Sequence, residues 1–533
     1  MAEQRRLVPV LLLTSGLGGA ATMVVELAAV RLLAPWFGTS LVVWTNVIAV
    51  VLVALSLGYL IVGRLAHGPS TLAWLQRALL AAGALVAWAP WGAALLAKSL
   101  LPGEVALENA VSLVGWGSLA VGGSVFLPPA VLLGMLCPLA LELISRTRSV
   151  VAGRAGGIVL SVSTFGILLG VFSTSYVLLP NLGLKNTFLF AEALLFLAGV
   201  AVQLLPGARS RASTLVFFIS LGGAAWLGSP PRPELRLGQR ELDYAESAYQ
   251  SLRVVEDRQN STTLRYLQIN EGFDSFQSVW QEAPGLLPSG FYYNDFLLPA
   301  CWTTPDPPWK ILVLGFGAGT VARIWLAEPK FRSQFIGVEL DPRVIEMGIR
   351  NFELETVATT LLSGIDARVA LRVVTEPQDQ VVLDCYANQV EIPAHLCTQE
   401  FFLELKDKLV EGGWLTANLG GFHFDDPVVS AVASTCSTVF GPVLLVSVPF
   451  SRNYMLVARR DAPIPWEDQR LKAPSRQAAL RLGPRSLDAM ARKVEPGARV
   501  LSDDRCPIES LQAESIRRAG AFRGEVTSLD VGS

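Results

Sequence analysis

The chain has 533 residues, which is enough for several domains. Its apolar fraction of 51% and mean hydropathy of +0.44 exclude an ordinary soluble protein, and its net charge of −2 gives no global field for a nucleic acid partner. The six cysteines form no CxxC pair and there are only three histidines, so we expect no metal site. Cysteines scattered in this way favour a reducing compartment.

The apolar excess is concentrated in residues 1–230, which we predict to be a membrane domain with about seven transmembrane segments. Six apolar runs are long enough to span a bilayer and a seventh is shorter: 8–34, 42–63, 73–97, 118–144, 156–180, 187–205 and 213–228. Arginines gather in alternate loops, which predicts a cytoplasmic N-terminus. A full seventh span would place the rest of the chain outside, whereas two short helices within 110–144, or an interfacial 213–228, would keep it in the cytoplasm.

Three charged residues lie within these apolar runs, where charge is costly. Glu26 and Arg31 are in the first run and Glu192 is in the sixth. They predict either a polar site for an ion or an amine, or a structural ion pair.

The soluble half is organised around a strand, a glycine turn, a second strand and an acid. An apolar strand is followed by Gly315, Gly317 and Gly319 in the pattern G-x-G-x-G, and the next apolar run, 335–338, ends in Glu339. Glycines let the main chain turn tightly against a ligand, and an acid at the tip of the second strand can accept hydrogen bonds from ribose hydroxyls. The spacing predicts a nucleoside-binding turn. An α/β domain with an empty turn is the alternative.

The details of this turn narrow the class of ligand. Position 320 is a threonine, so the third glycine of a dinucleotide-binding turn is missing, and so is the Gly-Lys-Ser/Thr of a P-loop. The turn resembles motif I of the S-adenosylmethionine-dependent transferases. That resemblance implies a Rossmann-like α/β domain with S-adenosylmethionine, or its decarboxylated form, as co-substrate.

Two more acids lie where ligands bind in such domains. Asp366 and Ala367 precede an apolar run, and an acid there either faces the adenine amino group or belongs to a surface turn. Asp384 ends the third strand, 380–383, and is the best catalytic candidate, because ligands of open parallel sheets bind outside the carboxyl ends of the strands. A carboxylate there can take a proton from an amine or hold the amine in line for attack.

A small β-region is predicted between the two halves. Apolar and polar residues alternate in two short segments, one of them at 252–256, which indicates antiparallel strands. The region resembles the N-terminal β-region of aminopropyltransferases. The resemblance implies that Tyr249, Gln250 and Gln277 lie against the nucleoside.

Residues 244–458 as a whole resemble spermidine synthases. The segment YYNDFLLPA at 292–300 stands where that family has a Tyr-His-Glu stretch, which implies that Tyr293 and Asp295 contact substrate. The family's catalytic loop precedes a Leu-x-Thr-x-Glu-Phe helix opening, and residues 396–401 fit that opening.

Two acids of that family are replaced here. Ala318 stands in the glycine turn and Ala387 stands in the catalytic loop. In the family those acids engage amines of the donor or the acceptor, and a lost carboxylate would leave a buried ammonium without its partner. Tyr386 is a second catalytic candidate, and Asn388 and Gln389 are predicted to line a different acceptor pocket.

The membrane half carries a resemblance of its own. Its landmarks at 26–40, 57–66 and 153–183 look like the membrane region of bacterial membrane-fused spermidine synthase-like proteins. Near the C-terminus, a stretch similar to the end of those proteins offers Asp503, Asp504 and Glu509 as acids that supply the missing charge. A capped surface helix is the alternative there.

Together these features predict a polytopic α-helical membrane domain at 1–230, a linker and small β-region at 231–300, a nucleoside-binding catalytic domain at 301–460 and a helical tail at 461–533. The predicted function is a membrane-anchored spermidine synthase-like transferase that moves an aminopropyl group from decarboxylated S-adenosylmethionine to a small amine. The alternatives are a methyltransferase or other user of S-adenosylmethionine, favoured by Ala318, and a transporter or sensor with a non-catalytic nucleoside- or polyamine-binding domain. We expect a bacterial inner-membrane protein with a cytoplasmic soluble domain, and a homodimer is a candidate assembly.

Overall fold

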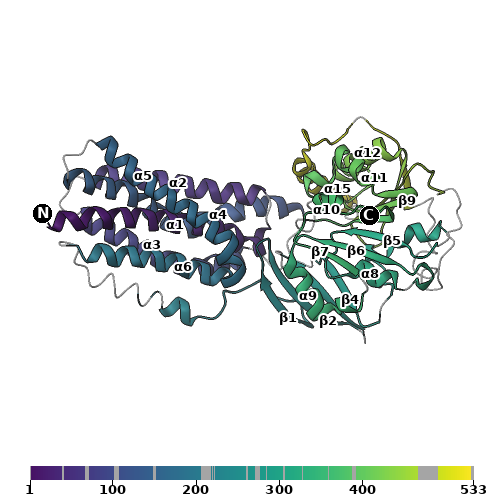
Figure 1. The fold of residues 1–533 in the computed structure, drawn as a ribbon, viewed down its shortest axis with the longest axis horizontal. Helices are drawn as coiled ribbons and strands as arrows, with labels where there is room; N and C mark the ends of the chain where they lie inside the picture. The colour runs from purple at the N-terminus through teal and green to yellow at the C-terminus, as the bar shows by residue number, and fades with distance from the viewer. Residues whose placement is uncertain are drawn as a thin grey trace. The chain divides into compact units, whose positions relative to one another are not determined.

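The structure is a computed structural model of the chain, shown in Figure 1. It describes residues 2–38, 41–65, 71–100, 107–147, 152–205, 218, 220, 222–259, 262–269, 276–283, 285–303, 306–326, 328–357, 359–386, 392–465, 490–497 and 499–529. The chain forms two compact units. The helical unit comprises residues 1–234, 245–251 and 270–273, and the remaining residues form the α/β unit.

The helical unit is a bundle of long apolar helices. In chain order they are α1 (Ala2–Phe37), α2 (Leu41–Leu65), α3 (Thr71–Leu100), α4 (Leu107–Thr147), α5 (Ala152–Ser173), the π-helical turn η1 (Thr174–Leu178) and α6 (Leu179–Gln203). Helix α1 packs against α4, α5 and α6, and α4 also packs against α2 and α3. Buried alanine, leucine and valine side chains from these helices form one continuous core.

Among the described residues, five helical stretches are long and apolar enough to cross a membrane, which indicates a multi-pass membrane protein. The fifth stretch, Gly153–Gln203, has 51 residues, whereas one crossing needs about 20. Gly183 breaks it with φ 73° and ψ 174°, and α5 and α6 on either side both pack against α1. The break therefore separates the two apolar runs of this stretch, 156–180 and 187–205.

Close main-chain contacts hold the bundle together. A Cβ added at Gly166 of α5 would lie 2.0 Å from the carbonyl oxygen of Gly16 in α1, and one added at Gly170 would lie 2.6 Å from that of Ala20. Such small-residue contacts drive helix association in membranes, where the hydrophobic effect between helices is weak.

The charged residues of the apolar runs have different surroundings. Glu192 is completely buried, and within the part of the chain that the structure describes neither of its carboxylate oxygens has a hydrogen-bond partner. The guanidinium of Arg31 donates to the main-chain carbonyls of Ala248 and Tyr249, which also belong to the helical unit. Residues 110–144 lie in the single helix α4, so the alternative of two short helices there is wrong.

The α/β unit opens with a four-stranded antiparallel sheet in the order β1-β2-β3-β4, as predicted for this region. Its strands are β1 (Gln239–Glu246), β2 (Ser251–Gln259), β3 (Thr262–Ile269) and β4 (Ser278–Gln281). The short helix η2 (Tyr292–Cys301) leads from it into the main sheet.

The main sheet has eight strands in the order β12-β10-β11-β9-β8-β5-β6-β7. They are β5 (Lys310–Leu314), β6 (Gln334–Glu339), β7 (Thr359–Ser363), β8 (Gln378–Leu383), β9 (Leu409–Gly420), β10 (Val443–Ser447), β11 (Asn453–Arg459) and β12 (Ala491–Val494). The strands from β7 to β9 are parallel, and β11, β10 and β12 add an antiparallel edge. This is the predicted Rossmann-like class. Because β5 lies between β6 and β8, the order reverses at β5, which is where such sheets bind ligands.

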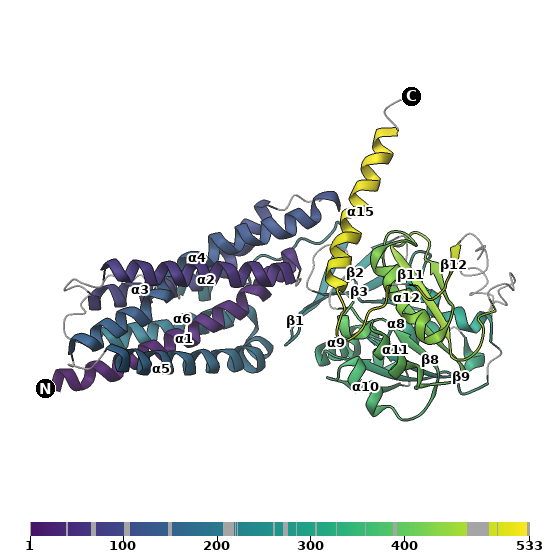
Figure 2. The ribbon, with the colours of Figure 1, turned by 90° about the horizontal axis from the view of Figure 1, so that it is seen from above.

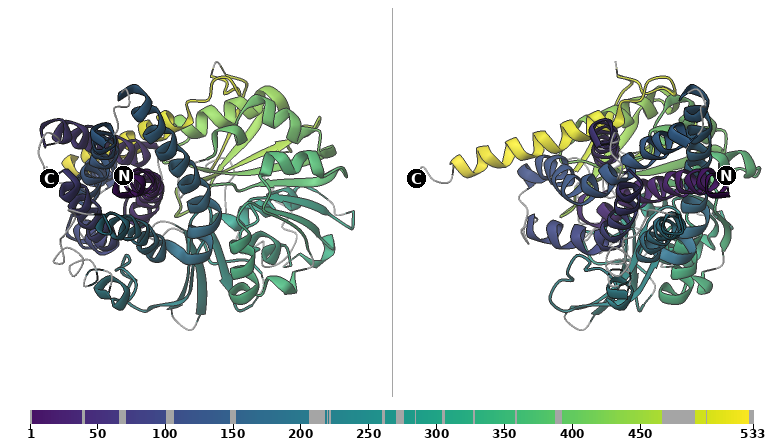
Figure 3. Two further views of the ribbon diagram at one scale, coloured as in Figure 1. Left: turned by 60° about the vertical axis from the view of Figure 1, so that its left-hand side comes forward. Right: turned by 90° about the vertical axis from the view of Figure 1, so that its left-hand side faces the viewer.

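Helices cover both faces of this sheet (Figure 3). They are α8 (Thr320–Trp325), α9 (Pro342–Phe352), α10 (Ala367–Val373), α11 (Gln399–Lys406), α12 (Pro427–Phe440) and α15 (Ile508–Leu529). Along β5 the side chains alternate, so Leu312 and Leu314 pack with α10, α11 and α12, while Ile311 and Val313 pack with η2 and α8. Helix α15 starts against α12 and runs out beyond it (Figure 2).

Candidate active site

The glycine turn after β5 closely approaches three other parts of the α/β unit. Gly315, Gly317 and Gly319 all have positive φ, at 81°, 56° and 88°. An added Cβ at these three positions would lie 2.2 Å from the Asp384 carbonyl oxygen, 2.5 Å from Ser278 Oγ and 2.6 Å from Leu354 Cδ1. Glycine is therefore required at each position, because other residues disfavour a positive φ and because there is no room for a Cβ atom.

Glu339 at the end of β6 holds this turn. Its Oε2 accepts a hydrogen bond from the Gly317 N–H at 2.9 Å, and its Oε1 accepts one from the Asp341 N–H at 3.0 Å. Burial raises the pKa of the Glu339 carboxyl to about 7, against the lowering effect of these N–H groups. On the other side of the turn, Ser278 Oγ accepts from the Ala318 N–H at 2.8 Å.

Asp384 follows β8 directly and is held by two donors. Its Oδ2 accepts from the Tyr292 hydroxyl and its Oδ1 from Asn418 Nδ2, each at 3.0 Å. Asn418 is oriented in turn, because its Oδ1 accepts from Asn453 Nδ2 at 2.8 Å. Burial raises the pKa of the Asp384 carboxyl to about 6, although both hydrogen bonds act to lower it. A base with a pKa near 6 is ionised at neutral pH and can still accept a proton.

Tyr386, the second predicted catalytic residue, is hydrogen-bonded to the end of β9. Its hydroxyl donates to the Asn418 carbonyl oxygen and accepts from the Gly420 N–H, both at 2.9 Å. Gln277, predicted to lie at the nucleoside, donates from Nε2 to the Tyr386 carbonyl oxygen at 3.2 Å. In this arrangement the phenol of Tyr386 secures the end of β9.

Asp366 and Ala367 open α10. The Asp366 carboxylate accepts from the Arg368 N–H at 2.8 Å and lies 2.9 Å from His395 Nε2. Burial raises the pKa of this carboxyl, but the hydrogen bonds from His395 and from main-chain N–H groups outweigh burial and lower the pKa overall. Ala367 is buried in the first turn of the helix.

The three predicted acids all act on the pKa of one thiol, that of Cys385. Burial raises the pKa of its thiol, and the charges of Glu339, Asp384 and Asp366 raise it further. The carboxyl ends of β6, β8 and the segment after β7 thus converge, as the parallel sheet predicts.

The other predicted site residues have different positions. Tyr293 is buried and stacks on Tyr292 with ring centroids 4.1 Å apart, so the tyrosine that contacts Asp384 is Tyr292. Asp295 is fully buried in η2. Tyr249 and Gln250 lie in the turn between β1 and β2, which groups with the helical unit. Asn388 and Gln389, like Ala387, fall outside the described residues.

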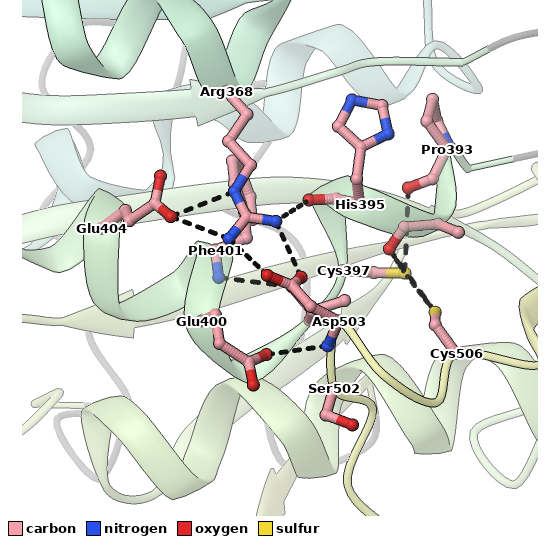
Figure 4. Close-up of polar contacts among 12 residues, drawn as sticks. Arg368, Pro393, His395, Cys397, Glu400, Phe401, Glu404, Ser502, Asp503 and Cys506 are labelled. Atoms are coloured by element: carbon pink, nitrogen blue, oxygen red, sulfur yellow. Dashed lines mark hydrogen bonds and ion pairs between the residues drawn. The ribbon is translucent and has the colours of Figure 1, made fainter.

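Three acids near the C-terminus are site candidates, namely Asp503, Asp504 and Glu509. Asp504 and Glu509 are exposed. Their neighbour Asp503 reaches Arg368 with both oxygens, at 2.7 and 2.8 Å, and Thr398 Oγ1 at 2.7 Å (Figure 4). The tail thus meets α10 and α11 through Asp503.

Sequence reasoning missed Tyr292, Asn418, Ser278 and His395. Asn418 could have been found from the sequence, because it is a polar residue inside the apolar run of β9. Tyr292 is adjacent to the tyrosine chosen by resemblance. Ser278 and His395 carry no local signal, since their contacts join segments far apart in the chain.

Comparison with known proteins supports a distant relationship for the α/β unit. No family model matches the chain. The polyamine aminopropyltransferase of Vibrio vulnificus is 31% identical over 162 residues, which are 30% of this chain and 52% of that protein. The polyamine aminopropyltransferase of Sulfolobus acidocaldarius is 26% identical over 157 residues, 28% of this chain and 51% of that protein. The chain spans about half the length of these curated relatives.

Solved structures give similar matches. A probable spermidine synthase from Corynebacterium glutamicum has a TM-score of 0.39 at 20% identity, covering 50% of this chain and 97% of that one. Spermidine synthase from Thermotoga maritima has a TM-score of 0.33 at 19% identity, covering 42% of this chain and 74% of that one. The chain is thus a distant homologue of polyamine aminopropyltransferases over about 30% of its length, preceded by apolar helices.

Proposed function

We propose that the protein is a membrane-anchored transferase that moves an aminopropyl group from decarboxylated S-adenosylmethionine to a small amine. The observation that carries this proposal is Asp384, an acid with a raised pKa at the carboxyl end of β8, oriented by Tyr292 and Asn418. It stands beside the glycine turn and Glu339, where the adenosine of the donor would bind.

The reaction that this geometry supports is a displacement at carbon. The lone pair of the acceptor amine forms an N–C bond to the methylene next to the sulfonium, while the C–S bond breaks and methylthioadenosine leaves. The amine gives its proton to the Asp384 carboxylate. Because Tyr292 and Asn418 each donate to one oxygen, the carboxylate cannot rotate freely, which keeps the amine in line with the leaving sulfur.

Ala318 favours a second candidate, a methyltransferase or other user of S-adenosylmethionine itself. Its side chain is 1% exposed, and a Cβ added at Gly348 of α9 would lie 3.4 Å from the Ala318 Cβ. The methyl group thus packs towards α9 and supplies no carboxylate for the free amine of a decarboxylated donor.

Calorimetry of the purified full-length protein with S-adenosylmethionine, its decarboxylated form and methylthioadenosine tests both candidates. Tighter binding of the decarboxylated form, with turnover of a diamine or triamine, supports aminopropyl transfer. Tighter binding of S-adenosylmethionine supports the second candidate. Binding of methylthioadenosine without turnover of any amine or methyl acceptor would instead favour a sensor or transporter module, and binding of none of the three would overturn the nucleoside site.

A further inference from the structure

The C-terminal segment before α15 is fastened to the start of α11 by a set of polar contacts (Figure 4). Asp503 binds Arg368 and Thr398, as described above. The Gln399 N–H donates to the Leu501 carbonyl oxygen at 2.8 Å. This segment is therefore held against α10 and α11 at two neighbouring points.

Two cysteines face each other at this junction. Cys397, just before α11, and Cys506, just before α15, have their Sγ atoms 3.6 Å apart. Both sulfurs also lie near the carbonyl oxygen of Ala394, at 3.2 and 3.4 Å. Cys397 is completely buried, whereas Cys506 is half-exposed. The pair thus has one sulfur that solvent can reach and one that lies behind it.

We propose that Cys397 and Cys506 form a reversible disulfide that fastens the C-terminal segment to the start of α11. A disulfide has an S–S length of about 2.05 Å, so the sulfurs must approach by roughly 1.5 Å. The polar contacts of Asp503 and Leu501 already bring the two chain segments together, so rotation of the cysteine side chains with a small shift of the exposed segment is sufficient. The pair has no part in the proposed transfer reaction.

The chemistry is a thiol–disulfide exchange with a small disulfide, such as oxidised glutathione, as the oxidant. The Cys506 thiolate attacks one sulfur of the oxidant, forms a mixed disulfide and expels one small thiolate. Cys397 then loses its proton to solvent and attacks Cys506 Sγ, which expels the second small thiol. Two protein thiols are oxidised and one small disulfide is reduced to two thiols.

The surroundings suit Cys506 to the first step. The hydrogen bond with Cys397 lowers the pKa of the Cys506 thiol against the raising effect of burial, and the Ile508 N–H at the start of α15 lowers it further. The same sulfur contact and burial raise the pKa of Cys397, so its thiol stays protonated in the first step and reacts second.

The bond would have a structural consequence near the proposed site. Cys397 lies in the short stretch that joins the loop after Asp384 to α11. A covalent link there closes a long loop of chain, and such links stabilise folded proteins most when the loop is long. Oxidation should therefore raise the thermal unfolding midpoint of the α/β unit by about 5 °C or more.

The experiment uses the full-length protein in detergent, equilibrated in glutathione buffers from reducing to oxidising, then alkylated, digested and analysed by mass spectrometry. We expect positions 397 and 506 to lose alkylation together, with a linked peptide pair that dithiothreitol removes. Cys506→Ser should abolish the link and the rise in unfolding midpoint, while Cys436→Ser, a buried cysteine of α12, should keep both. Free, alkylated thiols at 397 and 506 in every buffer, in wild type that remains folded, would overturn the proposal.

Discussion

The carboxyl of Asp384 accepts hydrogen bonds on both oxygens and still has a pKa raised to about 6, because burial outweighs the two donors. An acid in this state can serve as a base at neutral pH without being locked in an ion pair. Its partners come from η2 and β9, so three segments distant in sequence determine its geometry.

If Asp384 takes the proton, Asp384→Asn should lower turnover of donor and amine by about 10²–10⁴-fold while methylthioadenosine still binds. The wild-type rate should also rise with pH through about 6, as the carboxyl ionises. Steady-state kinetics and calorimetry measure the two effects, with the exposed Asp425→Asn as the matched control. A variant that keeps its rate would show that Asp384 only supports the loop.

The same raised pKa predicts how stability depends on pH. An unfolded aspartate ionises near pH 4, so between about pH 4 and pH 6 the folded state holds a proton that the unfolded state has lost. The contribution of Asp384 to stability is therefore present at low pH and is lost as pH rises through about 6. Thermal unfolding midpoints at pH 5 and pH 7.5 should differ less in Asp384→Asn than in wild type, and an equal difference in both would contradict the raised pKa.

Glu339 holds the glycine turn, and mutation can test its proposed second role as the acceptor for the ribose. We expect Glu339→Ala to weaken methylthioadenosine binding by roughly tenfold or more, because a charged acceptor for ribose hydroxyls is lost. Ser278→Ala is the control, since it removes a contact on the other side of the same turn. If calorimetry shows equal losses in the two variants, Glu339 acts through the shape of the turn and the placement of the ribose is wrong.

At the scale of elements, sequence spacing correctly predicted the succession of strand, glycine turn and acid. All three belong to one βαβ unit, so their positions depend on local sequence. Spacing could not predict that Tyr292 rather than Tyr293 reaches Asp384, nor which acid near the C-terminus contacts Arg368. Those outcomes depend on how a short helix and a tail pack on the sheet, and neighbouring side chains there point in different directions. Resemblance identified the segment that holds Tyr292, and for the tail it named Asp503 among three candidate acids.

The contact between α1 and α5 gives a prediction at the same scale. Gly166→Val would place atoms on the Gly16 carbonyl, 2.0 Å from an added Cβ, and should destabilise the bundle by about 1–3 kcal/mol. Gly157→Val on the same helix is the control, because an added Cβ there meets nothing within 4 Å. Thermal unfolding in detergent compares them, and equal midpoints would show that α1 and α5 do not pack this closely.

At the scale of the whole molecule, we propose that the α/β unit lies in the cytoplasm, where S-adenosylmethionine is made. A cysteine introduced by Arg258→Cys, at an exposed position of β2, should resist a membrane-impermeant maleimide in intact cells and react after lysis. The chain without the introduced cysteine gives the background from the partly exposed native thiols of Cys137, Cys385 and Cys506. Reaction in intact cells would place the unit outside and favour an exported function.

The break at Gly183 bears on whether the chain crosses the membrane an odd or an even number of times. If each of the five apolar stretches crossed once, the chain would leave the bilayer on the face opposite its first residue, whereas a reversal at Gly183 would make the fifth stretch two crossings. Six crossings would bring residue 203 back to the face where α1 begins. We therefore propose that the positive φ of Gly183, a conformation that most side chains avoid, sets the compartment that the chain faces after α6.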